Sequence, residues 1–122
     1  MKNLHLLRKK LHPARSFGFI QSVSPPDANA FRRRMTVIFS GHVQGVGFRY
    51  TAKTVATGFE ITGIVCNLPD GRVQLIAEGR REELDAFRAA LHDAGLAGFI
   101  RDETVDWAEA KNEFRGFEIV RS

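Results

Sequence analysis

The chain changes from strand to helix within the fourteen residues TVIFSGHVQGVGFR (36–49). The first five, Thr36–Ser40, are β-branched or aromatic at most positions, which favours a strand. Glycine fills three of the next seven positions and breaks the apolar run. Arg49 follows, where helical periodicity begins. Because the positive end of a helix disfavours a cation by about 0.3–1 kcal/mol, an arginine here indicates an anion beside it.

The segments after this stretch continue the alternation of strands and helices. The patterns predict helices over Phe48–Thr57 and residues 81–94, and strands over Ile61–Asn67, Arg72–Glu78, Thr104–Ala108 and Phe114–Val120. Leu68-Pro69-Asp70-Gly71 is typical of a tight turn between the second and third strands. The order β-α-β-β-α-β predicts an α+β fold of the ferredoxin-like split βαβ type, an antiparallel sheet with two helices on one face. It leaves an extra strand as an option at the end.

Composition limits the class of protein. The 122 residues suffice for one domain, and 43% apolar and 26% charged residues are ordinary for a globular protein. No apolar run approaches the roughly 20 residues that span a bilayer. The single cysteine, Cys66, suits a reducing compartment, so we expect a cytoplasmic protein. The four histidines are scattered without partners at metal-ligand spacing, and we expect no metal site.

The net charge of +4 is unevenly distributed. Residues 1–34 hold eight Lys/Arg and one acid, whereas residues 35–122 hold ten Lys/Arg and thirteen acids. The predicted domain, 35–122, is therefore mildly acidic. Three interpretations of the N-terminal arm, 1–34, remain open: a disordered basic arm, a misassigned start ahead of Met35, or an organelle transit segment.

The glycine loop before Arg49 has the makings of an anion site. Glycines let successive N–H groups turn inward, the following helix adds unpaired N–H groups, and a guanidinium matches phosphate oxygens bidentately. The alternative is a glycine-rich turn with a solvated arginine. A Walker A loop is excluded by Val46 and Gly47, and a GxGxxG loop by Tyr50. Val43 stands where a cysteine phosphatase has its nucleophile, so the loop offers no covalent chemistry.

Asn67 is the second candidate, at the end of the second predicted strand. Asparagine is common at such turns for structural reasons alone. Its amide, both donor and acceptor, could instead hold a water molecule in one orientation.

Two motifs carry a family resemblance. Gly41-His42-Val43-Gln44-Gly45-Val46-Gly47-Phe48-Arg49 resembles the acylphosphatase signature G-x-V-Q-G-V-x-F-R. Gly63-Ile64-Val65-Cys66-Asn67, followed by Gly71, Val73 and Gly79, resembles the second signature of that family, and the interval of eighteen residues from arginine to asparagine also matches. The resemblance covers about residues 35–121.

The resemblance implies hydrolysis of a small acyl phosphate to a carboxylate and inorganic phosphate, without metal or cofactor. It implies that Arg49 binds the phosphoryl group and Asn67 positions the attacking water. The phosphate-binding amides would be those of Gln44, Gly45, Val46, Gly47 and Phe48. His42 falls at a variable position and is expected to be a bystander. We expect a monomer whose partners are the acyl phosphate and inorganic phosphate, with no membrane.

Two other functions stay open at this stage. The family usually has threonine at Ala52, glycine at Glu60 and an aromatic residue at Ile64. Because of the last two departures, the chain could be a weakly catalytic phosphate-binding module. Some RNA-binding domains share the predicted topology, but they use exposed aromatics in a Lys/Arg-Gly-aromatic strand motif. The third predicted strand has none, so nucleic-acid binding is disfavoured.

Overall fold

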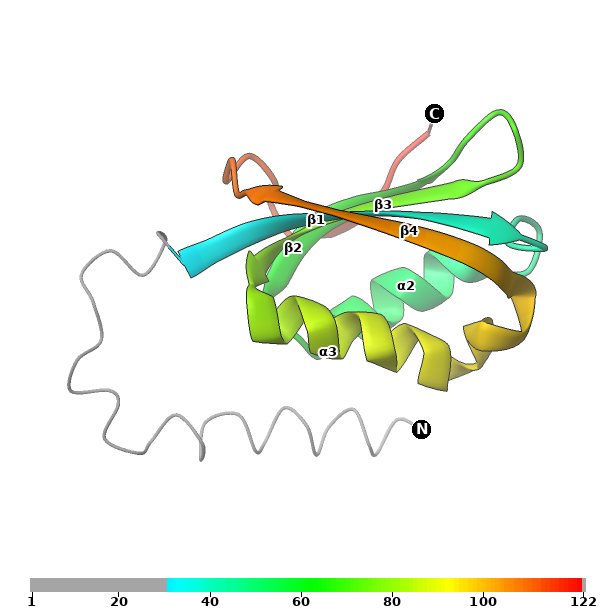
Figure 1. Cartoon of the computed structure of the whole chain (residues 1–122), viewed down its shortest axis with the longest axis horizontal. Helices are drawn as coiled ribbons and strands as arrows, with labels where there is room; N and C mark the ends of the chain where they lie inside the picture. Colours follow the sequence, from blue (N-terminus) through cyan, green and yellow to red (C-terminus); the bar gives the residue numbers. More distant parts are fainter. Residues whose placement is uncertain (1–30, 122) are drawn as a thin grey trace.

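The computed structural model describes residues 31–121 (Figure 1). The strands are β1 (Arg32–Gly41), β2 (Ile61–Asn67), β3 (Val73–Arg80), β4 (Ile100–Glu109) and β5 (Phe117–Ile119), and the helices are α2 (Phe48–Ala56) and α3 (Arg81–Leu91). Helix α3 passes into a π-type turn (His92–Leu96) and a 3₁₀ turn (Ala97–Phe99). The β-α-β-β-α-β order is confirmed, and β5 is the additional strand at the end.

The five strands form one sheet in the order β4-β1-β3-β2-β5. Strands β1 to β4 pair antiparallel, and Figure 1 shows both helices on the same face of the sheet. The ferredoxin-like class is therefore confirmed. The prediction of a wholly antiparallel sheet is corrected at one edge, because β5 runs parallel to β2 with Gly63 opposite Phe117.

Strand β1 begins earlier than the sequence pattern predicted. It starts at Arg32, so the arginine triplet assigned to the N-terminal arm belongs to the sheet. The predicted boundary at residue 35 followed the change in charge balance along the chain, but Arg34 pairs directly with Glu78 on β3. The remainder of the predicted arm, residues 1–30, lies outside the described residues. Strand β4 is likewise longer than predicted and β5 shorter.

The core lies between the sheet and the helices. Alternate residues of β1 and β3 are fully buried there, and α2 and α3 add their apolar stripes; the largest are Met35, Phe39, Phe48, Leu75, Leu84, Phe87 and Leu91. Aromatic contacts join the layers, with ring centroids 5.6 Å apart for Phe87 and Phe117 and 6.0 Å apart for Phe59 and Phe87. Packing against α3 thus fixes both β5 and the chain that enters β2.

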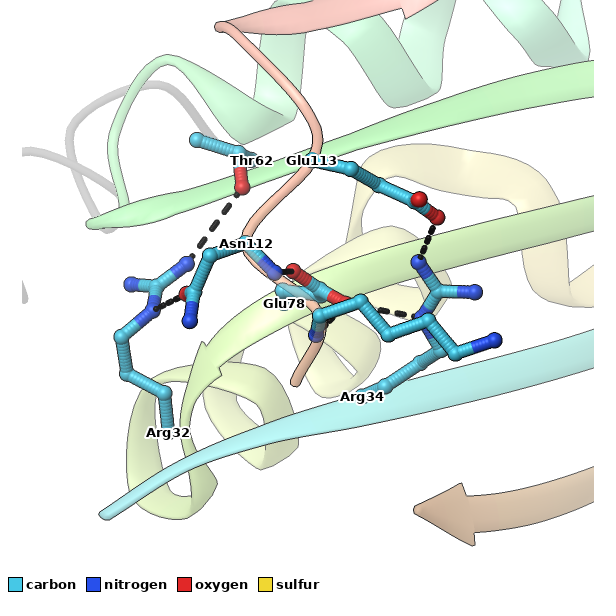
Figure 2. A network of polar contacts seen from close by, with 7 residues as sticks. Arg32, Arg34, Thr62, Glu78, Asn112 and Glu113 are labelled. Atoms are coloured by element: carbon cyan, nitrogen blue, oxygen red, sulfur yellow. Dashed lines mark hydrogen bonds and ion pairs between the residues drawn. The ribbon is translucent and has the colours of Figure 1, made fainter. Parts of the chain in front are cut away.

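A buried carboxylate fastens the connection from β4 to β5 (Figure 2). Glu78 is fully buried, and its Oε2 lies 2.7 Å from Nε of Arg34. The backbone N–H groups of Lys111 and Asn112 each donate to this carboxylate at 2.8 Å. Figure 2 shows Glu78 between Arg34 and the connecting segment, with Glu113 on the other side of the guanidinium. We call this set of contacts the Glu78 clasp; it holds the segment that leads into β5.

Candidate active site

A pocket of about 410 Å³ lies at the start of α2, beside the ends of β2 and β5. The residues that line it are Val43, Gly45, Gly47, Phe48, Arg49, Tyr50, Asn67, Ile119 and Arg121. They come from three separate parts of the chain. The pairing of β5 with β2 and the packing of α2 under the sheet bring these parts together.

The cradle loop (residues 41–47) turns its backbone in a way that needs glycine. Gly45 and Gly47 have φ angles of 79° and 78°, in the left-handed region that L side chains rarely adopt. In the described part of the chain, the N–H groups of Gln44 to Phe48 donate to no protein acceptor. Gly47 caps α2 without a side-chain hydrogen bond, and the helix has no acid in its first turn. The loop and helix end therefore present free donors and a positive dipole.

Apolar residues fix this loop to the core. Phe48 is 2% exposed, and its ring centroid lies 4.9 Å from that of Phe39 on β1. Val43 is fully buried. Phe48 therefore anchors α2 with its ring while its backbone faces the pocket.

The side chain of Gln44 links the cradle loop to the β2–β3 turn. Its Nε2 donates to the carbonyl oxygens of Leu68 and Arg72, both at 2.9 Å. Gln44 does not line the pocket, and neither does Val46, which packs against the core. The side-chain amide of Gln44 thus holds in place the turn that follows Asn67.

Arg49 extends from the first turn of α2 into the pocket wall. Within residues 31–121 it forms no ion pair with a carboxylate, in contrast to Arg34, Arg72 and Arg88. Its charge reaches Cys66 on β2. Burial raises the pKa of the Cys66 thiol above its ordinary value, and the positive charge of Arg49 opposes this only in part. Cys66 is therefore a buried, protonated strand residue.

Asn67 is the last residue of β2 and lines the pocket. Its Oδ1 atom is buried and has no hydrogen-bond partner among residues 31–121. A buried amide oxygen without a partner costs about 1–3 kcal/mol, so this atom is suited to a ligand that donates a hydrogen bond to it.

The pocket gathers most of the residues that the sequence singled out. Arg49, Asn67, Gly45, Gly47 and the backbone of Phe48 meet there, while His42 is exposed and outside it. Sequence reasoning missed Val43, Tyr50, Ile119 and Arg121. Ile119 and Arg121 carry no signal in the sequence alone, because only the parallel pairing of β5 brings them to this site.

The three residues that depart from the family pattern lie away from the pocket lining. Ala52 is buried in the core side of α2, and Ile64 pairs with Ile76 within the sheet. Glu60 precedes β2, and its N–H donates to Oε1 of Glu83 at 2.9 Å. None of them alters the set of groups that line the pocket.

Metal-ligand clusters are not found in the described part of the chain: no group of three or more His, Cys, Asp or Glu side chains is placed to hold an ion. The candidate site therefore consists of backbone N–H groups, one guanidinium and one amide, with a second guanidinium nearby.

Comparison with known proteins places the chain in a family. The acylphosphatase family model matches residues 35–119. Acylphosphatases of Mycobacterium sp. (strain JLS) and Trichormus variabilis are 38% and 40% identical to it, over 69% and 72% of this chain and 89% and 86% of theirs. The crystal structure of acylphosphatase from Bacillus subtilis superposes with a TM-score of 0.62 at 33% identity, over 72% of this chain and 98% of that one. These matches span the sheet, both helices and both motifs, and the chain belongs to the acylphosphatase family.

Proposed function

We propose that the protein hydrolyses a small acyl phosphate to a carboxylate and inorganic phosphate, and that the pocket binds the phosphoryl group of this substrate. Membership of the acylphosphatase family supports the reaction. The observation that carries the residue assignment is that Arg49 and Asn67 line one pocket with Gly45, Gly47 and Phe48, whose N–H groups donate to no acceptor within residues 31–121.

The phosphoryl group would be held by the backbone and by Arg49. Its three non-bridging oxygens accept hydrogen bonds from the amides of Gln44 to Phe48 and from the guanidinium fork. Phosphoryl transfer has a loose transition state with charge spread over these oxygens, so fixed donors stabilise it. Because the buried side chains of Val43 and Phe48 hold the loop against the core, the donors need little reorganisation.

Asn67 would position the water. Its unpartnered Oδ1 accepts a hydrogen bond from one O–H of the water, leaving the water's lone pair directed at phosphorus. A new P–O bond forms from the water oxygen, and the P–O bond to the acyl group breaks, its electron pair leaving with the carboxylate. One water proton stays on the attacking oxygen and the other passes to a phosphate oxygen, so the products are the carboxylate and dihydrogen phosphate.

This route needs no protein acid or base. The pocket lining, as far as residues 31–121 define it, includes no His, Asp or Glu side chain. A carboxylate leaves without protonation, and an oxygen of the substrate itself takes the proton. Positioning and charge stabilisation therefore account for the chemistry.

The binding-module alternative is not favoured. It rested on Glu60 and Ile64, which lie outside the pocket lining. We also propose that the protein acts as a monomer in the cytoplasm, since the site is built from one chain and the sequence has a single cysteine. No helix within residues 31–121 has the length and apolar character to cross a membrane.

The test is hydrolysis of benzoyl phosphate by the full chain in the presence of EDTA. We expect turnover and competitive inhibition by inorganic phosphate. Phosphate binding without hydrolysis would contradict the proposal and restore the binding module.

A further inference from the structure

The pocket is larger than a phosphoryl group needs. Its volume of about 410 Å³ extends past the cradle loop and Arg49 to a second wall formed by Tyr50, Ile119 and Arg121. Tyr50 is 74% exposed and Ile119 is half-buried, so this wall is apolar at two of its three side chains. The space beside it is where the acyl group of a bound acyl phosphate must extend.

The register of β5 explains how Arg121 reaches this wall. Val65 on β2 pairs with Ile119, and the N–H of Val120 donates to the carbonyl oxygen of Val65 at 3.0 Å. Continuing the parallel register by two residues on each strand places Arg121 beside Asn67. Since alternate residues of a strand share a face, Arg121 follows Ile119 toward the pocket.

The charges of the pocket are unbalanced. Of the lining residues within 31–121, two are cations, Arg49 and Arg121, and none is an acid. The nearest acid of β5, Glu118, lies on the alternate face and pairs with Nζ of Lys53 at 3.2 Å. In the proposed function Arg49 and the loop N–H groups bind the three phosphoryl oxygens, which leaves Arg121 as an additional cation in the pocket lining.

We propose that Arg121 binds a second anionic group carried on the acyl chain. The preferred substrates are then acyl phosphates whose acyl part bears a carboxylate or a similar anion, and Arg121 determines this specificity. The inference rests on the proposed function and adds to it a substrate class.

Three probes test the inference, and in none of them can a carboxylate attack its own acyl phosphate. Benzoyl phosphate has a neutral acyl group, and 3-carboxybenzoyl and 4-carboxybenzoyl phosphate add one carboxylate at two positions on a ring that cannot cyclise. We expect the full chain to have a higher kcat/KM for at least one carboxylated probe, chiefly through a lower KM. The preference should shrink as salt is raised from low to about 1 M, because the pair is exposed.

Variants of Arg121 then assign the preference. Arg121→Gln should lower the ratio of kcat/KM between carboxylated and neutral probes about fivefold, the upper range for one exposed charge pair. Arg121→Lys should keep more of the ratio than Arg121→Gln, because the charge remains. Arg115→Gln removes an exposed arginine that does not line the pocket and should leave the ratio at the parental value.

Three other outcomes would contradict the inference. If Arg121→Gln lowers the affinity for the neutral probe, the carboxylated probes and inorganic phosphate equally, Arg121 serves the phosphoryl group and the inference is wrong. An absence of preference in the parent chain would also overturn it, while the proposed function would stand. If the parent hydrolyses none of the probes, the proposed function fails and this inference fails with it.

Discussion

Arg49 and Asn67 line the same pocket although eighteen residues separate them in the chain. Arg49 belongs to the first turn of α2, and Asn67 is the last residue of β2. The two elements pack together across the core, so the pocket depends on the fold as well as on the motif. The guanidinium and the side-chain amide thus line one space, as the proposed roles in phosphoryl binding and water positioning require.

Gln44 should be required for the relative position of loop and turn. Gln44→Ala removes two hydrogen bonds to Leu68 and Arg72, with a loss of about 1–2 kcal/mol in the free energy of unfolding. We expect kcat/KM for benzoyl phosphate to fall about tenfold, because Asn67 adjoins the released turn. Urea denaturation and steady-state kinetics measure the two effects.

Gln44→Glu provides the matched comparison. It keeps the shape of the side chain but turns a donor into an oxygen that faces two carbonyl oxygens. It should therefore be more harmful than Gln44→Ala in both measurements. Equal or milder effects would show that the two hydrogen bonds do not hold the turn.

Gly47→Ala should reduce activity more than its stability cost explains. The φ angle of 78° makes a Cβ unfavourable by about 1–2 kcal/mol, although no atom within 4 Å would contact it. Relief of that strain would rotate the peptide units on either side of residue 47, whose N–H groups are proposed to bind phosphate. The measurements are kcat/KM for benzoyl phosphate and the inhibition constant of phosphate.

Gly71→Ala is the control for this strain. Gly71 has a φ of 97° with open space around it, but lies in the β2–β3 turn outside the pocket lining. It should lose similar stability while phosphate inhibition stays near the parental value. If both variants weaken phosphate inhibition alike, the cradle loop has no special role.

The Glu78 clasp should stabilise the fold at neutral pH and fail in acid. Burial acts to raise the pKa of Glu78, but the N–H of Lys111, the guanidinium of Arg34 and the N–H of Asn112 together lower it below its ordinary value of 4.5. A carboxylate with a lowered folded-state pKa adds stability above its unfolded pKa and loses it as pH falls through the folded value. The free energy of unfolding should therefore decline below about pH 4.5.

Glu78→Gln should remove that contribution. It leaves buried donors facing an amide nitrogen, and we expect a loss of roughly 2–3 kcal/mol at pH 7 with a flatter profile below pH 4.5. Glu113→Gln, at the exposed end of the same network, should cost at most about 1 kcal/mol. Equal losses from the two variants would contradict a buried clasp.

The sequence predicted what depends on local patterns. The bounds of β2 matched those predicted, because Ile61–Asn67 is apolar and ends in turn residues. Helix α2 began at Phe48 as predicted, since glycine precedes it. Five of the site residues predicted from the two motifs line the pocket, Gly45, Gly47, Phe48, Arg49 and Asn67, whereas Gln44 and Val46 do not.

Non-local pairing explains what the sequence did not predict. The polar triplet Arg32–Arg34 joins β1, where Arg34 is paired by a buried glutamate distant in sequence and Arg32 donates to Asn112. The contribution of Ile119 and Arg121 depends on a three-residue strand that pairs parallel to β2. Neither the partner nor the direction of such a short strand is encoded in its own residues.

The most direct test of the division of roles compares Arg49→Gln with Asn67→Ala in the full chain. Benzoyl phosphate hydrolysis and phosphate affinity by calorimetry are measured for each, with Arg115→Gln as a matched control outside the pocket lining. Both variants should lose at least about 10²-fold in kcat. Arg49→Gln should also lose phosphate binding, whereas Asn67→Ala should bind phosphate within about threefold of the parental affinity, because a buried amide that serves only the water leaves the phosphoryl donors in place. Hydrolysis near the parental rate in either variant, or equal loss of phosphate binding in both, would contradict the account.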